Sequence, residues 1–584
     1  MPLKNIKQIR LLDGIESCTA QATLKSIFKH RAEINRNYIM SLQNHNLLQN
    51  HYYEAGLWTP WGKPDDCHGG WEYPTSSVKG QFLGHWMSAA AQLVYYENDA
   101  EAGAKLSHVI NELEKCQKAN GGKWVHSCPE KYLQWALEGR LVGVPHYTIH
   151  KTMMGLWDSW YFAKSQKALD ILLNFTDYFI EFTNALSTKQ MDDLLDLETG
   201  GMMEIFANIY GQTQDPKHKA LMEKYCRRRL FNPLVEGQDV LTNMHANTTI
   251  PEIIGAAKAY EVTGDDYYMR AVKAYWDCAV TNRGYYATGS ADSGEIWCPS
   301  SDLLERMGVK TQEHCTRYNM IRLAEFLFRH TADAFYADYI ELSLYNGILA
   351  QQHPETGMPA YHLPIMPGAV KEWGTPTQTF WCCHGSIVQM HAMYPEIICH
   401  KSDQGLVISQ FIPCEIAMDN GKIILELDTQ GGLSQSLETH HTGPVTKPTT
   451  IKYNLTAHGG EYTIKLRKPR WATSMKINGQ NADAHNGFIS INKAWDGQTL
   501  VIELCKEIQQ IPLPGHENMV AFMDGPVVLA GLCTSESMPK GTMRPIDTKR
   551  WMEWRNEYIL GSVRFIPLHE IIDQQYTVYF DKKG

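Results

Sequence analysis

The stretch Lys151–Leu186, KTMMGLWDSWYFAKSQKALDILLNFTDYFIEFTNAL, decides the fold class of this 584-residue chain. Apolar residues recur in it every three or four positions over several turns, which is the period of a helix that buries one face. Residues 81–96 (QFLGHWMSAAAQLVYY) and 319–352 (NMIRLAEFLFRHTADAFYADYIELSLYNGILAQQ) keep the same pattern. Loops rich in Gly, Pro and Asn separate these segments. We therefore expect pairs of helices through most of the first 400 residues.

The hydrophobic pattern changes near residue 400. From there apolar and polar residues alternate, as in residues 406–418 (LVISQFIPCEIAM) and 498–508 (QTLVIELCKEI), with Asn-Gly, Gly-Gly and Asp-Gly steps between the runs. Alternation broken by such steps is typical of β-strands joined by tight turns.

We expect a multidomain α+β protein in three parts. Residues 1–400 are predicted to form an (α/α)6 helical barrel, although the helical period alone does not close the ring. Residues 401–513 are predicted to form a β-sandwich and residues 514–584 a smaller β module. The first residues, 1–13, contain KNIKQIRLL, which we expect to be a strand that joins one of the C-terminal sheets.

Composition excludes several classes of function. The net charge is −10, and no Lys/Arg cluster follows the spacing of phosphates, so nucleic acid is not an expected partner. No run of about 18 uncharged apolar residues predicts a membrane span, and the N-terminus lacks the apolar segment of a signal peptide. We expect a soluble, cytoplasmic protein whose 14 cysteines are mostly buried free thiols. The sequence does not fix the oligomeric state, and a homodimer is one alternative.

Two thiols stand side by side in Phe380–Ser386, FWCCHGS, and a third follows a carboxylate in Glu313-x-Cys315. Three thiols and a carboxylate suit one tetrahedral zinc ion, because all four ligands are anionic. Adjacent cysteines on a strand would point to opposite faces, so a shared metal requires an irregular turn, which Gly385 would permit. The alternative is three buried thiols that only pack.

A run of carboxylates occupies residues 285–305, YYATGSADSGEIWCPSSDLLE. Glu295 stands out because Ile296 and Trp297 follow it, and an apolar setting would raise its pKa and make it a general acid. The alternative is a solvated acidic loop. The chain also has 16 Trp and 29 Tyr, many in loops beside His and Gly, which suits a sugar pocket, although aromatic residues also fill helical cores.

Several motifs together resemble the glycoside hydrolase family 127 and 146 group, the β-L-arabinofuranosidases. They are EHC at 313–315, YNGILAQQHPETGMPAYHLPIMPG at 345–368, FWCCHGS, and DGPVVLAG at 524–531. Further similar stretches, such as HYTIHKTMMGLWDSW at 146–160, extend the resemblance over most of the chain.

The resemblance implies a role for seven residues. Glu313, Cys315, Cys382 and Cys383 match the zinc ligands of the family, and Cys382 also matches its nucleophile. Glu295 matches the glutamate of a Gly-Glu step that serves as acid/base. His150 and His245 fall where the family places histidines that bind the sugar; for each, the alternative is a buried histidine with a structural role.

The resemblance thus implies a retaining exo-glycosidase that releases β-L-arabinofuranose from small oligosaccharides or glycosides. One alternative keeps this mechanism with another sugar. A second is a non-catalytic carbohydrate-binding protein with a structural zinc site, which would have no use for Glu295. A cysteine peptidase or thiol oxidoreductase is disfavoured, because redox motifs usually keep two residues between their thiols.

Overall fold

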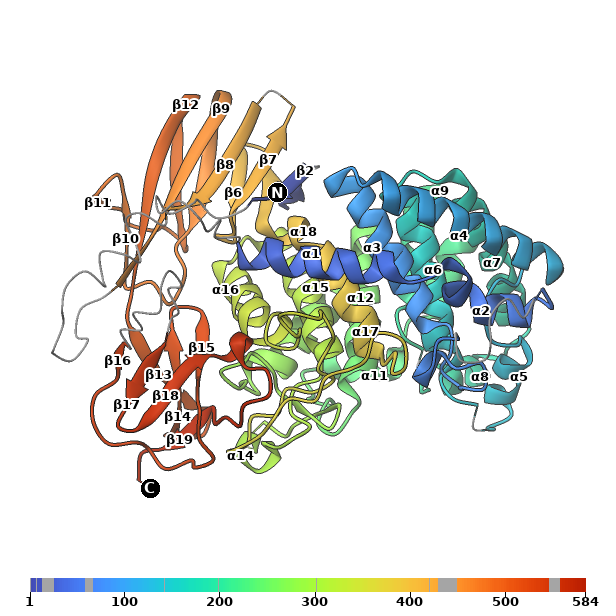
Figure 1. The fold of residues 1–584 in the computed structure, drawn as a ribbon. Helices are drawn as coiled ribbons and strands as arrows, with labels where there is room; N and C mark the ends of the chain where they lie inside the picture. Colours follow the sequence, from blue (N-terminus) through green and yellow to red (C-terminus); the bar gives the residue numbers. More distant parts are fainter. Residues whose placement is uncertain are drawn as a thin grey trace.

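The computed structural model describes residues 2–6, 8–12, 26–57, 67–140, 142–197, 199–300, 302–419, 421–428, 449–545 and 557–583. Figure 1 shows a helical N-terminal part beside two β-sheet regions that follow it in the chain. No helix among the described residues is long and apolar enough to cross a membrane.

Six helices form a closed inner ring. Each packs on the next in chain order, and the last, α17, packs back on the first, α3. The inner helices are α3 (Gln81–Glu97), α6 (Pro145–Tyr161), α9 (Met202–Thr213), α12 (Ala246–Thr263), α15 (His314–Thr331) and α17 (Cys382–Ala392). The expected (α/α)6 barrel is therefore confirmed, and the contact between α17 and α3 supplies the closure that periodicity could not.

Each inner helix has an outer partner that packs against it. The outer helices are α4 (Ala100–Ala119) on α3, α7 (Gln166–Asn184) on α6, α10 (Pro216–Lys224) on α9, α13 (Asp266–Trp276) on α12, α16 (Ala334–Ser343) on α15 and α1 (Ile27–Ser41) on α17. Shorter helices lie in the connections: α2 (Asn44–Glu54), α5 (Lys131–Leu137), α8 (Thr188–Leu195), α11 (Arg228–Val235), α14 (Leu303–Arg306) and α18 (Tyr394–Ile398).

Several outer helices begin at side-chain caps. Asp99 accepts a hydrogen bond from the amide of Ala102 at 3.0 Å, and Asp333 accepts one from the amide of Phe335 at 3.0 Å. Such caps satisfy amide groups that have no partner within the helix, and each contributes about 1 kcal/mol. The outer helices are thus fixed by their own sequence as well as by packing.

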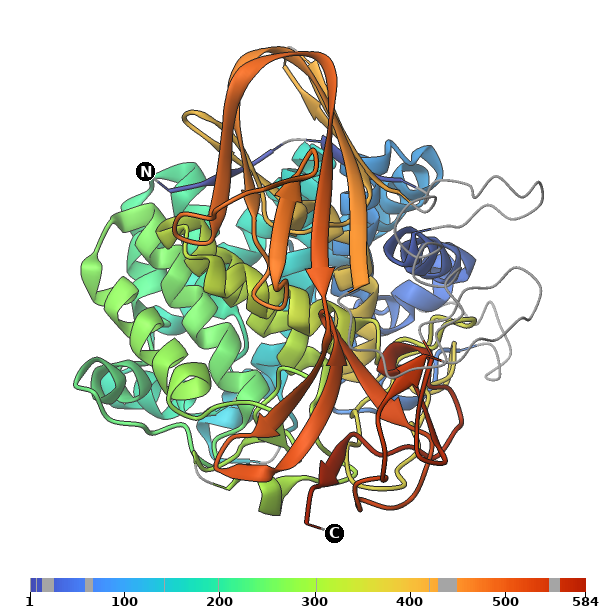
Figure 2. The same cartoon turned by 90° about the vertical axis from the view of Figure 1, so that its left-hand side faces the viewer.

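In the part of the chain that the structure describes, the first β region is one sheet of ten strands, of which two are long. β9 (Thr449–Arg467) and β12 (Phe488–Lys506) pair along their whole length, with an irregular register between Trp495 and Gln498. Figure 2 shows both strands arching over, so that their two halves face each other. The other strands that follow the barrel are β5 (Cys399–Ser402), β6 (Gly405–Ile408), β7 (Cys414–Met418), β8 (Gly421–Leu427), β10 (Ser474–Ile477) and β11 (Gln480–Asn481).

The N-terminal segment also lies in this sheet. β1 (Lys4–Asn5) pairs with β5, and β2 (Gln8–Leu11) pairs with β7. The chain therefore passes from the β region into the barrel and returns to the same sheet after α18.

Among the described residues, the second β region is a sheet of seven strands. Its order is β13 (Ile508–Leu513), β14 (His516–Asp524), β15 (Val527–Gly531), β18 (Val563–Pro567), β17 (Tyr558–Leu560) and β16 (Arg544–Pro545), and β19 (Tyr579–Asp581) also pairs with β14, on the same edge as β15. The sheets change at Glu507, earlier than the boundary after Leu513 expected from the sequence. The reason is that β13 pairs with β14 and not with β12.

Candidate active site

The four predicted metal ligands lie at the starts of two neighbouring inner helices. Glu313 is the N-cap residue of α15, and Cys315 lies in the first turn of that helix. Cys382 and Cys383 are the first two residues of α17. Because α15 packs on α17, the two helix starts bring all four side chains together.

The expectation of an irregular turn at the cysteine pair is wrong, because the pair opens a regular helix. Gly385 has a different role from the one expected. A Cβ atom on Gly385 would lie 2.2 Å from Cδ2 of His85 on α3. The glycine therefore permits the close approach of α17 to α3, which places the thiols.

The distances within the cluster fit a tetrahedral metal ion. Cys383 Sγ lies 3.7 Å from Cys315 Sγ and 3.8 Å from Cys382 Sγ, and Cys382 Sγ lies 3.4 Å from Glu313 Oε1. All four ligand atoms lie within 4.8 Å of one another. Zinc–thiolate bonds of about 2.3 Å give a tetrahedron with edges of about 3.8 Å. The sulfur atoms are much farther apart than the roughly 2.05 Å of a disulfide bond.

Burial makes the cluster dependent on a cation. Glu313 and the three cysteines are at most 4% exposed. Burial raises the pKa of Cys382 and of Cys383 well above the ordinary thiol value, and burial followed by the nearby Cys382 raises that of Glu313. Burial also opposes ionisation of Cys315, but hydrogen bonds from the other two thiols outweigh it and lower its pKa to about 7. A bound cation would stabilise all four anions.

Neighbouring polar groups orient Glu313. Its backbone amide donates to Asp292 Oδ2 at 2.9 Å, and the Thr316 hydroxyl donates to its Oε2 at 3.3 Å. Asn247 Nδ2 donates to Oε1 at 3.5 Å, and Asn247 is itself held by Asn319 Nδ2 at 2.8 Å. Hydrogen-bonding partners of this kind fix the orientation of metal-binding side chains.

Glu295 occupies the tip of a small hairpin. The strands β3 (Asp292–Ser293) and β4 (Ile296–Trp297) are joined by Gly294 and Glu295, both with positive φ, as in a type I′ turn. Glu295 has a φ of 68°, which costs a residue other than glycine about 1 kcal/mol or more. The turn is fixed to the start of α12, because the Ala246 amide donates to the Glu295 carbonyl at 2.8 Å.

His245 contacts the carboxylate that this turn presents. Its Nε2 lies 3.3 Å from Glu295 Oε2, and its Nδ1 lies 2.6 Å from Thr248 Oγ1. One nitrogen of His245 and one oxygen each of Glu295 and Glu313 lie within 4.8 Å of one another. The structure thus joins Glu295 and His245 to the thiol cluster.

The pKa of Glu295 differs from the sequence expectation. A hydrogen bond from His245 is the largest cause and lowers this pKa, while burial opposes it. The predicted rise is therefore wrong. The sequence placed Ile296 and Trp297 beside Glu295 but did not show that His245 faces it.

All six inner helices begin without a side-chain cap among the described residues, and three of them start beside the site. The N-cap residues are His245 for α12, Glu313 for α15 and Trp381 for α17, and none of their side chains caps its own helix. Each lacks the roughly 1 kcal/mol of a cap. His245 and Glu313 instead contact the site, and the positive ends of the helix dipoles favour anions there.

Tyr361 and His362 belong to the site although the sequence reading gave them no role. The carbonyl of Tyr361 accepts from Cys383 Sγ at 3.6 Å, and its side chain hydrogen-bonds Glu295. His362 Nε2 lies 4.0 Å from Glu295 Oε1. Both residues fall in a stretch that carried the family resemblance, but no spacing rule links that loop to the other two motifs.

His150 is the predicted site residue with the least direct connection to the thiol cluster. It lies on α6, is 2% exposed, and both ring nitrogens are buried without a hydrogen-bond partner. Tyr147, one turn earlier on α6, packs with the three clustered thiols. His150 therefore lies on the helix that flanks the cluster, but no hydrogen bond or ion pair joins it to the other six predicted residues.

These features define an (α/α)6-barrel protein with a buried centre of three thiols and a carboxylate at the N-terminal ends of the inner helices. Residues 22–396 match the model of the β-L-arabinofuranosidase GH127 catalytic domain, and residues 405–505 match that of the GH127 middle domain. The chain belongs to the GH127 β-L-arabinofuranosidase family of glycoside hydrolases.

Solved structures share the fold over the whole chain. The GH127 β-arabinofuranosidase BT3674 superposes with a TM-score of 0.73 at 16% identity, covering 99% of this chain and 98% of its own. Ara127N-Se, a GH127 β-L-arabinofuranosidase from Geobacillus stearothermophilus T6, gives 0.70 at 15% identity, covering 98% and 99%. A sequence search of curated proteins found no match.

Proposed function

We propose that the protein is a retaining exo-glycosidase that releases β-L-arabinofuranose from small oligosaccharides or glycosides. The observation that carries this proposal is the position of the Cys382 thiol. Its sulfur lies 3.4 Å from a carboxylate oxygen of Glu313, which in turn lies within 4.8 Å of the Glu295 carboxylate. A nucleophile and an acid/base thus share one small space.

Zinc is the metal we propose for the cluster, held by Glu313, Cys315, Cys382 and Cys383. Three thiolates and one carboxylate are ligands that zinc accepts in tetrahedral sites. The bound ion would keep the buried thiols deprotonated near neutral pH, which their burial alone opposes.

The first step would form a bond between Cys382 Sγ and the anomeric carbon of the sugar. The bond from that carbon to the glycosidic oxygen breaks, and the oxygen takes a proton from Glu295 as the aglycone leaves. In the second step Glu295 removes a proton from water, and the water oxygen attacks the anomeric carbon. The sulfur–carbon bond breaks and restores the thiolate. Two displacements at one carbon retain its configuration.

The pair of His245 and Glu295 can hold the proton that the first step needs. With His245 Nδ1–H donating to Thr248 Oγ1 at 2.6 Å, one further proton on the 3.3 Å contact, either on His245 Nε2 or on the Glu295 carboxyl, makes the pair an acid. The lowered pKa of Glu295 then describes how that proton is shared within the pair. Transfer to the leaving oxygen leaves a neutral histidine beside a carboxylate.

The test is release of p-nitrophenol from aryl glycosides by zinc-loaded, reduced protein. We expect turnover of the β-L-arabinofuranoside, a loss of at least about a thousandfold in Cys382→Ser, and normal turnover in Cys505→Ser. Cys505 is a half-buried free thiol on β12 and serves as the matched control. Normal turnover in Cys382→Ser would refute the thiolate mechanism.

Two other results have defined meanings. Turnover of a different aryl glycoside, still lost in Cys382→Ser, would keep the mechanism and change the sugar. If no aryl glycoside were hydrolysed although each chain held one zinc ion, the result would favour a protein that only binds carbohydrate. The strained φ of Glu295 speaks against that last alternative, because backbone strain of this kind concentrates at functional sites.

A further inference from the structure

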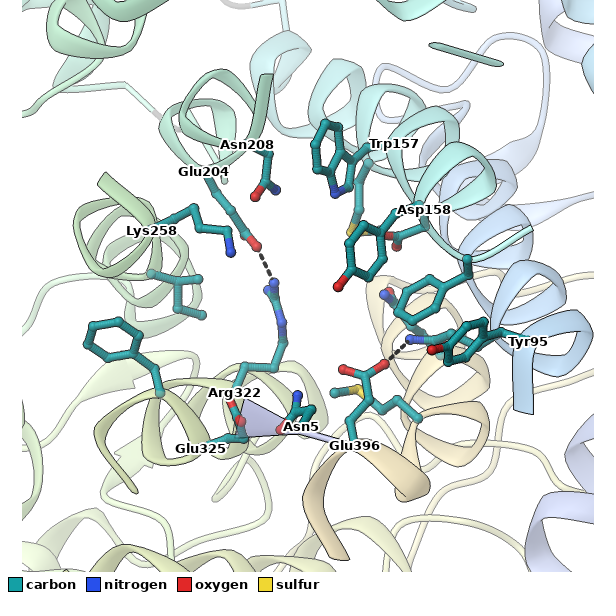
Figure 3. Close-up of a pocket in the computed structure, with 18 of the residues that line it drawn as sticks. Asn5, Tyr95, Trp157, Asp158, Glu204, Asn208, Lys258, Arg322, Glu325 and Glu396 are labelled. Carbon is teal, nitrogen blue, oxygen red and sulfur yellow. Dashed lines mark hydrogen bonds and ion pairs between the residues drawn. The ribbon is translucent and has the colours of Figure 1, made fainter. Parts of the chain in front are cut away.

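A second cavity lies inside the barrel, farther along the inner helices than the thiol cluster. It encloses about 600 Å³, and all six inner helices contribute to its wall. One lining residue from each is Gln92 (α3), Asp158 (α6), Glu204 (α9), Lys258 (α12), Arg322 (α15) and Gln389 (α17). Figure 3 shows these helices around the space, with Asn5 of β1 at its edge.

This cavity is separate from the candidate active site. Arg322 lies two turns beyond Cys315 on α15, which is about 10 Å along the helix axis. Among the residues that the structure describes, none of the seven candidate site residues lines the cavity. The buried Lys151 lies between the two, since it interacts electrostatically with Cys315 and Cys382 on one side and with Arg322 and Glu204 on the other.

The charged groups in the wall largely neutralise one another. Five acidic and five basic side chains of the described residues line the cavity. Arg322 pairs with Glu204 at 2.5 Å, and Figure 3 shows this ion pair crossing the wall. The others that pair are Lys258 with Glu261 at 2.7 Å, and Arg329 with Glu261 at 2.6 Å and with Glu325 at 2.7 Å. A charged ligand would therefore meet repulsion as well as attraction, which favours a neutral one.

Two carboxyl groups in the wall form no ion pair with a described residue. Glu396 accepts a hydrogen bond from Gln92 Nε2 at 3.0 Å, and Asp158 faces the same space in Figure 3. Burial raises the pKa of Asp158 to about 7 and that of Glu396 to about 8. Near neutral pH both groups are therefore often protonated, so they can donate a hydrogen bond as well as accept one.

Two polar oxygens of residues beside the cavity lack a hydrogen-bond partner among the described residues. Gln92 is 2% exposed, and its Oε1 is buried with no partner. Glu204 Oε2 is likewise buried without one. A buried acceptor that lacks a donor costs about 1–3 kcal/mol, so native structures rarely leave it unsatisfied.

Aromatic side chains complete the wall. Trp157 turns its indole ring toward the space in Figure 3, and Tyr95, Tyr161 and Phe162 also line it. Flat aromatic faces beside planar amide, carboxyl and guanidinium groups suit a molecule with one apolar face and a rim of hydroxyl groups.

We propose that this cavity, which we call the distal cavity, binds a neutral mono- or disaccharide through Trp157, Asp158, Gln92 and Glu396. Its volume falls within the range of about 300–1,000 Å³ that is typical of small-molecule sites. The sugar would stack on the indole and exchange hydrogen bonds with the carboxyl groups of Asp158 and Glu396, which line the space. The inference stands apart from the proposed hydrolysis, because it uses none of the residues proposed for it.

The experiment is a ligand-observed NMR titration of His245→Ala protein, whose catalytic end is impaired. The probes are L-arabinose, D-galactose, D-galactosamine and D-galacturonate at about pH 6.5, where the last two carry opposite charges. We expect binding of the neutral sugars and weaker binding of both charged analogues. Adding Trp157→Ala should weaken binding of the neutral sugars about tenfold or more.

Trp135→Ala in the same background is the matched control. Trp135 lies on α5 beside Tyr132 and does not line the distal cavity, so binding should stay unchanged. A crystal of the wild-type protein soaked in D-galactose should show the sugar against Trp157, a result that needs no variant to fold. Unchanged affinity in Trp157→Ala, a sugar seen only at the thiol cluster, or tenfold tighter binding of a charged analogue would each overturn the proposal.

Discussion

Substitution of Gly385 by alanine tests how packing of the barrel places the thiols. The added Cβ would lie 2.2 Å from Cδ2, 2.8 Å from Cγ and 3.0 Å from Nε2 of His85. His85 is 1% exposed, and its Nδ1 lies 2.8 Å from Gln389 Oε1, so the ring is held from the side of α17 as well. The contact can be relieved only by moving the ring or the helix.

The size of that movement follows from the distances. Ordinary contacts of a Cβ atom begin at 3.4 Å, so relief from 2.2 Å requires 3.4 − 2.2 = 1.2 Å. Metal sites tolerate deviations of about 0.2 Å in their ligand distances. Overpacking costs about 1–3 kcal/mol, which exceeds or offsets the gain of about 1 kcal/mol from alanine in a helix. We therefore expect a lower melting temperature and weaker metal binding.

The assay is thermal unfolding together with metal content per chain after dialysis against a weak chelator. Gly103→Ala in α4 is the matched control, because its Cβ would meet only Val94 Cγ2, at 3.5 Å. That variant should gain up to about 1 kcal/mol and keep its metal. If Gly385→Ala melted and bound metal as the wild type does, the argument that this glycine places the thiols would be wrong.

Three further predictions concern the site and the sheets. In His245→Gln, the basic limb of the kcat/KM profile should move about one pH unit or more toward acid. The reason is that Glu295 alone holds the catalytic proton less tightly than His245 and Glu295 do together. A pH–rate profile checks this. In the wild type, Cys315, Cys382 and Cys383 should resist iodoacetamide until the metal is chelated. In Cys315→Ser, the remaining Cys382 and Cys383 should react without chelation. Mass spectrometry of the alkylated protein would show both results. Lys506→Met should lower the free energy of unfolding by about 3–5 kcal/mol, because it leaves the buried Asp524 without the ammonium group that lies 2.6 Å away in the wild type. The double variant Lys506→Met/Asp524→Leu should lose much less of that free energy. Denaturant unfolding measures both.

The class of fold could be predicted because it depends on period and length. Helical stripes before residue 400 and alternation after it distinguish the barrel from the sheets, and these patterns are local. The bend of β9 and β12 and the place of β13 could not be predicted. The first depends on pairing between distant segments, such as Leu504 with Ile451, and the second on β13 pairing with its neighbour β14; alternation is the same whichever partner a strand has.

The candidate site shows the same limit in its chemistry. That Glu313 and the three thiols could share one site was predicted from their anionic side chains, and the structure brings the four together. The lowered pKa of Glu295 was not predicted, because its cause is His245, fifty positions away in the chain. Tyr361 and His362 enter through a loop whose position depends on how the barrel closes.

The barrel itself explains why anionic groups collect at one end. Outer helices run back between the inner ones, so the inner helices share one direction, and the starts of α12, α15 and α17 meet at one mouth. Their dipoles favour thiolates and carboxylates at this mouth. The later turns of α12 and α15 present Lys258, Arg322 and Arg329 to the distal cavity, where cations offset the negative helix ends. The shared direction of the inner helices therefore favours anions at one end of the barrel, where the proposed catalytic centre lies, and cations at the other, where they pair with the carboxylates of the distal cavity.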